Sequence, residues 1–315
     1  MNVLITCCLG DFMRGTVKCL KDAFSDVKVI GVDMEEKHFH VDYIDVFYKV
    51  CSSDDPDYIY EIIDICKKEE VDVVIPIHTY EIDLFGEKKD MFDRIGVVVA
   101  ASDVNIDIVN NKDRLYEFMK NNGIKCADYY VVKDENEMND AISKIGESDA
   151  CIKKPYGCGG RGFNVCCDIS STKSIMFPII VQKYLTGDEY TVDCFCSKGN
   201  VIYYCVKKNY EMENGVAVKA VTLDEPKIAE DCKRVCELLK LDGCIGFDLK
   251  ADKDGDVFII DCNPRLTATI SLSCTTGVNY VECLVKNALG MPVPVYQSRK
   301  YGVHIVRKKV DYFYE

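Results

Sequence analysis

The chain has 315 residues, 48% of them hydrophobic, and a formal net charge of −13 at pH 7. At about 100–200 residues per domain, this length predicts two or three domains. No apolar run approaches the roughly 18 residues that span a membrane. Because nucleic-acid binding normally requires a basic face, the acidic balance argues against a nucleic-acid partner, although a local basic pocket for phosphate is compatible with it.

The amino terminus and the cysteines indicate a cytoplasmic protein. Met1 leads directly into a strand-like run with no basic segment before it, so we expect neither a signal peptide nor a membrane anchor. The 19 cysteines are scattered through apolar runs without a C-x-x-C pair. This pattern favours buried free thiols in a reducing compartment over disulfides or a metal cluster. The histidines show no metal-ligand spacing.

The first hundred residues alternate strand-like and helix-like segments. Strands are expected at 3–8, 28–32, 73–77 and 97–100, and helices at 16–24 and 57–70. Continuous apolar strands separated by helices predict a parallel sheet with right-handed crossovers. Ligands of such sheets lie beyond the carboxyl ends of the strands, where the sequence places Arg14, His78 and Glu81. These residues and Arg307 are substrate-pocket candidates on position alone, and ordinary polar loop residues are an equally good interpretation.

From Asn111 the pattern changes, and strands of antiparallel type dominate. Helices are expected at 111–122, 134–145, 227–239 and 276–289. Strands are expected at 150–153, 163–167, 179–184, 190–197, 201–208, 243–250, 256–261 and 304–307. We predict an α/β amino-terminal domain at 1–110, an α+β domain at 111–290 with a lid subdomain near 126–185, and a strand and tail at 291–315.

The most unusual segment is the glycine-rich stretch at 153–162. Gly157, Gly159 and Gly162 form G-x-G-x-x-G, but strand-like residues follow where a dinucleotide-binding fingerprint requires a helix. No P-loop motif occurs in the chain. A glycine loop between antiparallel strands exposes N–H groups that cradle phosphate oxygens, and Lys154 before it adds a positive charge. The alternative, for the segment taken alone, is a merely mobile glycine loop.

Two aspartates are expected to face each other across a hairpin. Asp254-Gly255 between two apolar runs predicts a two-residue type I′ turn. Lys253 would then face Asp256, and Asp248 would lie opposite Asp261. Like charges in that relation are destabilising, so the pair requires a cation or a shifted pKa. With Asn263 two residues further on the same face, these oxygens suit Mg²⁺. A solvated polar strand end is the alternative, and an EF-hand fails on its sixth and twelfth positions.

Taken in order, these features resemble the ATP-grasp superfamily over nearly the whole chain, and in particular proteins similar to the carbamoyl phosphate synthetase large subunit and to biotin carboxylase. The resemblance implies an α/β and α+β ATP-grasp fold, with a parallel βαβ domain, a small lid and an antiparallel-sheet subdomain. It also implies ATP-binding residues, namely Lys112, Lys154, Gly157, Gly159, Gly160, Gly162, Gln182, Lys183, Tyr184, Leu185 and Glu189.

Within that set, the backbone of Lys183 and Leu185 would bind the adenine edge, and Glu189 would bind the ribose hydroxyls. Gln182 stands where the family often has a glutamate. Asp248, Asp261 and Asn263 match the metal ligands, although glutamates are usual at the two acidic positions. The shorter aspartates would bring the metals closer to the strands.

The resemblance further implies an ATP- and Mg²⁺- or Mn²⁺-dependent ligase that forms an acyl phosphate and passes the acyl group to an amine. Arg265 and Lys154 would be catalytic, with Arg265 orienting the intermediate. Carboxyphosphate or carbamoyl phosphate chemistry is one alternative, and a non-catalytic ATP-binding regulator is another. The expected partners are a small carboxylate and an amine, contacted from loops at 211–219 and 266–276, and the family makes a homodimer possible.

Overall fold

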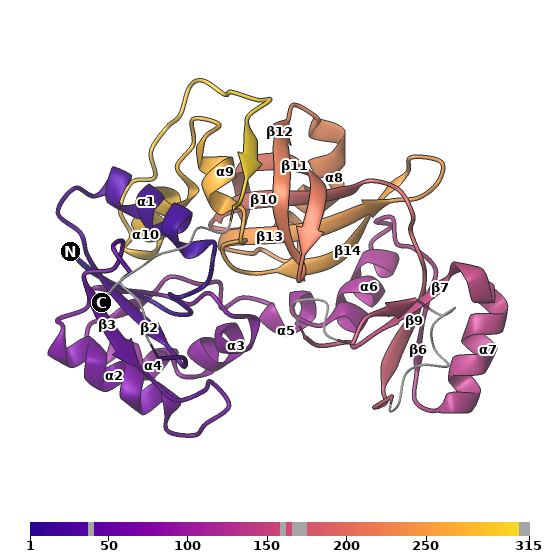
Figure 1. Ribbon diagram of the computed structural model, residues 1–315, viewed down its shortest axis with the longest axis horizontal. Coiled ribbons are helices and arrows are strands. Elements are labelled where there is room, and N and C mark those ends of the chain that lie inside the picture. The colour runs from indigo at the N-terminus through magenta and orange to yellow at the C-terminus, as the bar shows by residue number, and fades with distance from the viewer. Residues whose placement is uncertain (37–40, 158–161, 166–174, 309–315) are drawn as a thin grey trace.

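A computed structural model describes residues 1–36, 41–157, 162–165 and 175–308 of the chain (Figure 1). Three sheets organise these residues: a parallel sheet at the amino terminus, a small antiparallel sheet, and a larger antiparallel sheet between them. The expected combination of α/β and α+β parts is therefore confirmed.

The amino-terminal domain is a parallel sheet in the order β3-β2-β1-β4-β5. Its strands are β1 (Asn2–Ile5), β2 (Lys28–Asp33), β3 (Val46–Lys49), β4 (Val73–Ile75) and β5 (Val98–Val99). Its helices are α1 (Met13–Ala23), α2 (Tyr58–Lys68), α3 (Thr79–Glu87), α4 (Lys89–Asp93) and α5 (Ile106–Val109). The inner strands β1 and β4 are buried, as continuous apolar runs covered on both faces require. The edge strand β3 is half-buried and was not expected, because its sequence carries no such run.

The small sheet forms the lid subdomain, with strand order β6-β9-β7-β8. The strands are β6 (Tyr129–Val132), β7 (Ala150–Lys153), β8 (Asn164–Val165) and β9 (Ile179–Lys183). Helix α6 (Lys112–Asn121) precedes the sheet, and α7 (Glu135–Ile145) packs on it through Met138 and Ala141. The Asp134 side chain caps α7 by accepting the backbone N–H of Glu137.

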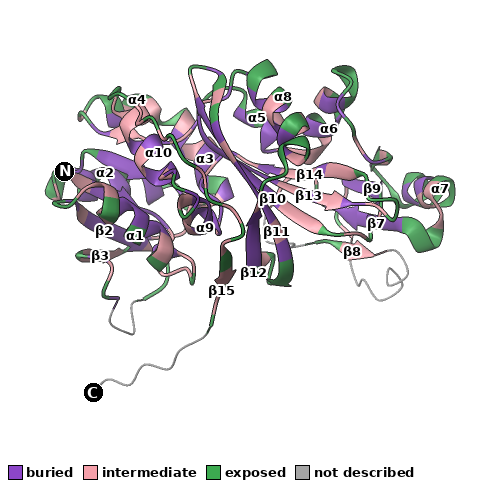
Figure 2. Ribbon diagram, turned by 90° about the horizontal axis from the view of Figure 1, so that it is seen from above, coloured by how far each residue is buried: buried purple, intermediate pink, exposed green. Residues whose placement is uncertain are grey.

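The central sheet has the order β14-β13-β10-β11-β12-β15. Its strands are β10 (Glu189–Ser197), β11 (Asn200–Glu213), β12 (Val216–Leu223), β13 (Gly243–Ala251), β14 (Val257–Asn263) and β15 (His304–Val306). Its helices are α8 (Glu230–Leu238), α9 (Ile270–Cys274) and α10 (Tyr280–Ala288). Figure 2 shows buried residues along β2 and along β10 and β12, and exposed ones over much of α7.

Two expectations for this region need correction, and the expected strand near 304–307 is confirmed as β15. Residues 211–219, expected to be a substrate loop, belong to the hairpin of β11 and β12. Helix α10 begins at Tyr280 rather than near 276, because Gly277 has a φ of +98° and Asn279 is the N-cap. Strand β15 pairs with β12, so part of the expected tail completes the central sheet. The domain limits at 110 and 290 otherwise stay predictions.

Two hydrophobic clusters position the functional residues. One joins β1 and α1 to α10 through residues such as Val17 and Val281, and the other packs α6 and α8 under the central sheet. None of the helices in the described ranges has the length and apolar character needed to cross a membrane. The cysteines of the same ranges are free thiols.

Candidate functional site

The hairpin of β13 and β14 places Asp248 directly opposite Asp261, as the sequence predicts. The turn that led to this prediction is nevertheless wrong. Ala251 pairs with Val257, so residues 252–256 form the connection and Lys253 does not face Asp256. Asp252 closes this longer loop, because its Oδ1 accepts the backbone N–H groups of Asp254 (2.9 Å) and Asp256 (3.0 Å).

A β-bulge restores the expected register. Leu249 pairs with Ile259 and Asp248 with Asp261, so Ile260 is the extra residue on β14. The carbonyl oxygen of Ile260 accepts the hydroxyl of Tyr116 at 2.6 Å and lies 3.2 Å from the Lys153 Nζ. The bulge therefore sets where the Asp261 carboxylate lies.

Among the residues that the structure describes, no lysine or arginine lies at ion-pair distance from Asp248. Its Oδ2 accepts the Asn263 amide at 3.1 Å, and its Oδ1 lies 3.4 Å from the Thr191 hydroxyl. Burial, and secondly the charge of Asp261, raise the pKa of Asp248 to about 6. Two facing carboxylates whose negative charge is disfavoured in this way are suited to bind a divalent cation.

Asp261 lies beside the first of the expected lysines. The Lys112 Nζ is 3.0 Å from Asp261 Oδ1 and 3.1 Å from the carbonyl oxygen of Gly157. The backbone N–H of Lys112 also donates to the carbonyl of Pro155. Lys112 thus joins the start of α6 to the metal-ligand candidates and to the start of the glycine-rich loop.

Arg265 follows β14 and reaches the amino-terminal domain. Its guanidinium contacts the Thr79 hydroxyl at 3.2 and 3.3 Å, the Asn263 Oδ1 at 3.0 Å and the Leu266 carbonyl at 3.3 Å. Within the part of the chain that the structure describes, no carboxylate lies at ion-pair distance from it. A half-buried arginine beside two acidic metal-ligand candidates is suited to an anionic substrate.

The buried lysine of β7 is Lys153, which directly precedes the expected ATP-binding residue Lys154. Lys153 is 8% exposed, and its Nζ contacts Tyr116 Oη. Burial, and secondly the charge of Lys112, lower the pKa of Lys153 to about 8. Lys154 follows directly after the end of β7 and is exposed.

The expected hinge follows β9. Gln182 is 2% exposed, and its Nε2 has no hydrogen-bond partner among the residues that the structure describes. Lys183 and Tyr184 donate their backbone N–H groups to Asp128 and Asp149, so the Lys183 carbonyl is the group suited to an adenine amine. Leu185 is buried. Glu189 forms an ion pair of 2.7 Å with Lys250 and is partly exposed.

Two of the positional candidates for the substrate pocket, Glu81 and Arg14, bond to residues of the amino-terminal domain. Glu81 is 3% exposed and accepts Tyr58 Oη at 2.5 Å, Thr6 Oγ1 at 2.5 Å and the His78 N–H at 3.0 Å, so it is a structural anchor. Arg14 forms an exposed ion pair with Asp42. Both side chains thus have partners within the amino-terminal domain, and their assignment to a substrate pocket stays a prediction.

His78 and Arg307 differ from each other in environment. The His78 ring packs on Tyr80 with ring centroids 5.1 Å apart, next to the Thr79 that Arg265 contacts. It is the one positional candidate beside the site. The guanidinium of Arg307 donates to the carbonyls of Ala217 and Ala268 and so holds β15 against the segment that follows Arg265. Gly159 and Gly160 lie outside the described residues.

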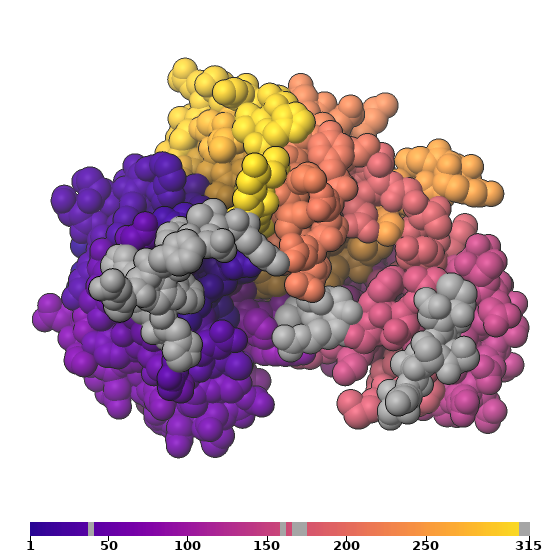
Figure 3. Space-filling view, in the orientation of Figure 1, coloured from indigo at the N-terminus to yellow at the C-terminus, as the bar shows by residue number. Residues whose placement is uncertain are grey.

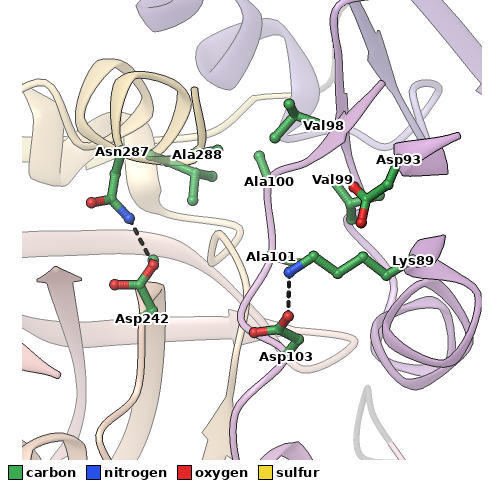
Figure 4. A pocket seen from close by; sticks show the side chains of 12 residues that line it. Lys89, Asp93, Val98, Val99, Ala100, Ala101, Asp103, Asp242, Asn287 and Ala288 are labelled. Atoms are coloured by element: carbon green, nitrogen blue, oxygen red, sulfur yellow. Dashed lines mark hydrogen bonds and ion pairs between the residues drawn. The ribbon is translucent and has the colours of Figure 1, made fainter. Parts of the chain in front are cut away.

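The site lies where the three parts of the chain meet. Arg265 contacts Thr79 of α3, and Lys112 joins Asp261 to Gly157. Figure 3 shows the surface hollowed between the amino-terminal domain and the lid subdomain, with the central sheet above the hollow. A separate cavity of about 280 Å³ lies between β5, α4 and α10 and contains none of the expected residues (Figure 4).

Comparison with known proteins defines the class. Residues 176–310 match the model "ATP-grasp in the biosynthetic pathway with Ter operon", and residues 3–100 match "PylC-like, N-terminal domain". The fold is similar to that of a biotin carboxylase ATP-analogue complex from Campylobacter jejuni, with a TM-score of 0.76, 17% identity, and coverage of 96% of this chain and 74% of that one. The chain therefore has an ATP-grasp domain behind a PylC-like amino-terminal domain.

Two curated proteins are similar to this chain in sequence. A carbamoyl phosphate synthase large chain from Clostridium acetobutylicum is 23% identical over 227 residues, which cover 66% of this chain and 21% of that one. A formate-dependent phosphoribosylglycinamide formyltransferase from Bacteroides fragilis is 23% identical over 265 residues, covering 77% of this chain and 67% of that one. The match thus spans about a fifth of the synthase. By sequence, this chain is similar to both enzymes over part of its length.

Proposed function

We propose that this protein is an ATP- and Mg²⁺-dependent carboxylate–amine ligase that acts through an acyl phosphate. The observation that carries the proposal is the convergence of Asp248, Asp261 and Asn263 with Arg265, whose guanidinium has no carboxylate partner in the described ranges. A protein that only bound a nucleotide would need the acidic pair but not this arginine.

The acidic pair fits a divalent cation. Two facing carboxylates with an amide oxygen beside them are the ligand type of Mg²⁺ or Mn²⁺, and burial and the charge of Asp261 raise the pKa of Asp248, so its negative charge is disfavoured without a bound cation. A bound Mg²⁺ would neutralise charge on the nucleotide phosphates. Asp248, Asp261 and Asn263 would hold it.

The remaining residues would bind and orient ATP. Lys112 lies at the acidic pair and would bind the terminal phosphates. We propose that Lys153 shares this role in place of Lys154, because Lys153 is buried and within contact of the bulge carbonyl. Gln182 and the Lys183 carbonyl would form hydrogen bonds with adenine, and Glu189 would bind the ribose hydroxyls. The glycine-rich loop would cover the phosphates and exclude water.

Arg265 would orient the reacting groups in both steps of the reaction. A carboxylate oxygen of the substrate attacks the γ-phosphorus of ATP, the bond to ADP breaks, and an acyl phosphate forms. The guanidinium of Arg265 would hold the carboxylate and then the acyl phosphate in a two-point geometry. An amine then attacks the acyl carbon, phosphate leaves, and the amine loses a proton. The homodimer and the cytoplasmic location stay predictions.

The test is ADP release from MgATP in the presence of pools of amino acids and other carboxylates, including formate and bicarbonate. The wild type is compared with Asp261→Asn and with the control Asp254→Asn, which lies in the exposed turn. Release that depends on one pool, persists in the control and is lost in Asp261→Asn supports the ligase. Stimulation by bicarbonate alone supports carboxyphosphate chemistry, and binding of ATP without any stimulation supports a nucleotide sensor.

A further inference from the structure

A fully bonded polar network lies beneath the segment that follows Arg265. The Lys207 Nζ is 2.5 Å from Asp193 Oδ2, 2.7 Å from Thr269 Oγ1 and 3.3 Å from Thr267 Oγ1. Asp193 also accepts the hydroxyls of Thr267 at 2.7 Å and of Ser273 at 2.5 Å. Lys207 is 0% exposed and Asp193 2%, so the ion pair is isolated from water.

The network shares one face of the central sheet with the acidic pair. Thr191 pairs with Asp248 on one side and with Lys207 on the other, and Asp193 is two residues further along β10. Asp193 pairs with Gly246 of β13, and the segment that follows Arg265 packs over this pair. A Cβ on Gly246 would lie 2.1 Å from the Thr267 methyl group, so glycine lets Thr267 rest on the strand.

The anchored segment follows Arg265 directly in the chain, and Arg265 is hydrogen-bonded to the residues on both sides of it. Arg265 donates its backbone N–H to the Asn263 carbonyl at 2.7 Å and its guanidinium to the Leu266 carbonyl. Thr267 and Thr269 follow immediately and are held by Asp193 and Lys207. The chain is therefore anchored after Arg265 by Thr267 and Thr269, and before Arg265 by Asn263.

Stability alone does not explain this arrangement. Removing two charges from water costs more than a well-placed ion pair usually returns, and apolar replacements of the whole pair are often neutral or stabilising. An ion pair with a unique set of partners instead specifies one arrangement of the chain. We infer that Asp193 and Lys207 are positioning residues, which hold the segment from Leu266 to Thr269 so that Arg265 faces the Asp248–Asp261 pair. The inference rests on the proposed function.

The experiment separates positioning from folding by a double-mutant cycle. Asp193→Leu and Lys207→Met are made singly and together. Thr222→Val is the control for loss of a buried hydroxyl, because Thr222 lies opposite Lys207 on β12 but its hydroxyl accepts the backbone N–H of Val303. We measure thermal unfolding, affinity for MgADP, ADP release with the carboxylate pool that stimulates the wild type, and amide hydrogen exchange of residues 266–273.

Each single variant is expected to lose stability, because it leaves one buried charge alone, and the double variant is expected to recover it. With folding restored, the double variant should still lose about 100-fold in kcat, because a misplaced positioning group costs on that order. Its affinity for MgADP should match that of the wild type. Exchange at 266–273 should be faster than in the wild type and in Thr222→Val.

A double variant that folds, turns over and exchanges like the wild type overturns the inference. If no carboxylate stimulates the wild type, the proposed ligase fails separately, and hydrogen exchange decides the positioning role alone. In that case, faster exchange at 266–273 in the stable double variant supports the role, and unchanged exchange contradicts it.

Discussion

At the scale of single residues, the charge of Asp248 depends strongly on its surroundings. Its pKa is raised to about 6 from 3.8, so the folded protein binds this proton more tightly than the unfolded chain does. In metal-free protein its contribution to stability is therefore present at low pH and is lost as the pH rises from about 4 to about 6.

Replacing Asp248 with asparagine should remove this loss. The free energy of unfolding of Asp248→Asn, relative to that of the wild type, should increase with pH and level off above about pH 6, with a gain of at most about 3 kcal/mol. Urea unfolding with a chelator present checks this, and Asp254→Asn in the exposed turn is the control. A difference that does not depend on pH would contradict the assigned cause.

The two neighbouring lysines should differ in their effect on ATP binding. Lys153 is buried beside the acidic hairpin and Lys154 is exposed. Lys153→Met should raise the KM or Kd for ATP about tenfold or more, since a charge-assisted hydrogen bond contributes about 1.5–3 kcal/mol. Lys154→Met should stay within about twofold, as for an exposed charge. Equal effects would show that Lys154 reaches the phosphates as the sequence suggested.

At the scale of secondary-structure elements, the bulge at Ile260 determines the acidic pair. Tyr116 of α6 and Lys153 of β7 both reach the Ile260 carbonyl, so the bulge is held by two elements outside its own hairpin. A hairpin with bonds only to itself would allow this register to shift.

Tyr116→Phe should therefore weaken metal binding as well as stability. Removing the hydroxyl leaves the buried carbonyl with a weaker set of partners, which costs about 1–2 kcal/mol of unfolding free energy. We also expect a lower affinity for Mn²⁺, measured by electron paramagnetic resonance. Tyr129→Phe, whose ring packs 5.1 Å from that of Tyr116, is the matched control. Unchanged Mn²⁺ affinity in Tyr116→Phe would mean that the bulge does not set the metal site.

At the scale of the whole molecule, ligand binding should join the three parts. The contact of Arg265 with Thr79 connects the central sheet to the amino-terminal domain. Lys112 connects the central sheet to the start of the glycine-rich loop, because it contacts both Asp261 and Gly157. MgADP at about 100 times its Kd should add about 2.7 kcal/mol to the unfolding free energy, seen as a rise in Tm. ADP with a chelator should give a smaller rise, and Asp261→Ala should remove the difference between the two. A Tm that rises equally with and without Mg²⁺ would argue against the acidic pair as the metal site.

Much of this fold could be predicted because its signals are local. The buried strands β1, β4 and β7 read as apolar runs, and α2 and α7 show helical spacing. Elements without such a signal are not predicted: β3 and β6 are short, and the expected loop at 211–219 includes the start of β12. Their existence depends on pairing with strands distant in sequence, which spacing along the chain does not express.

By itself, the sequence determined which residue types are available and in what order: the acidic hairpin, Asn263, Arg265, the glycine-rich loop and the alternation of strand and helix. Only the tertiary structure decided which of them meet. It buried Lys153 and left Lys154 exposed, paired Glu81 and Arg14 with Tyr58 and Asp42, and recovered the Asp248–Asp261 pairing through a bulge despite a misjudged turn. The reason is that burial, pairing register and shared partners depend on contacts between segments far apart in the chain.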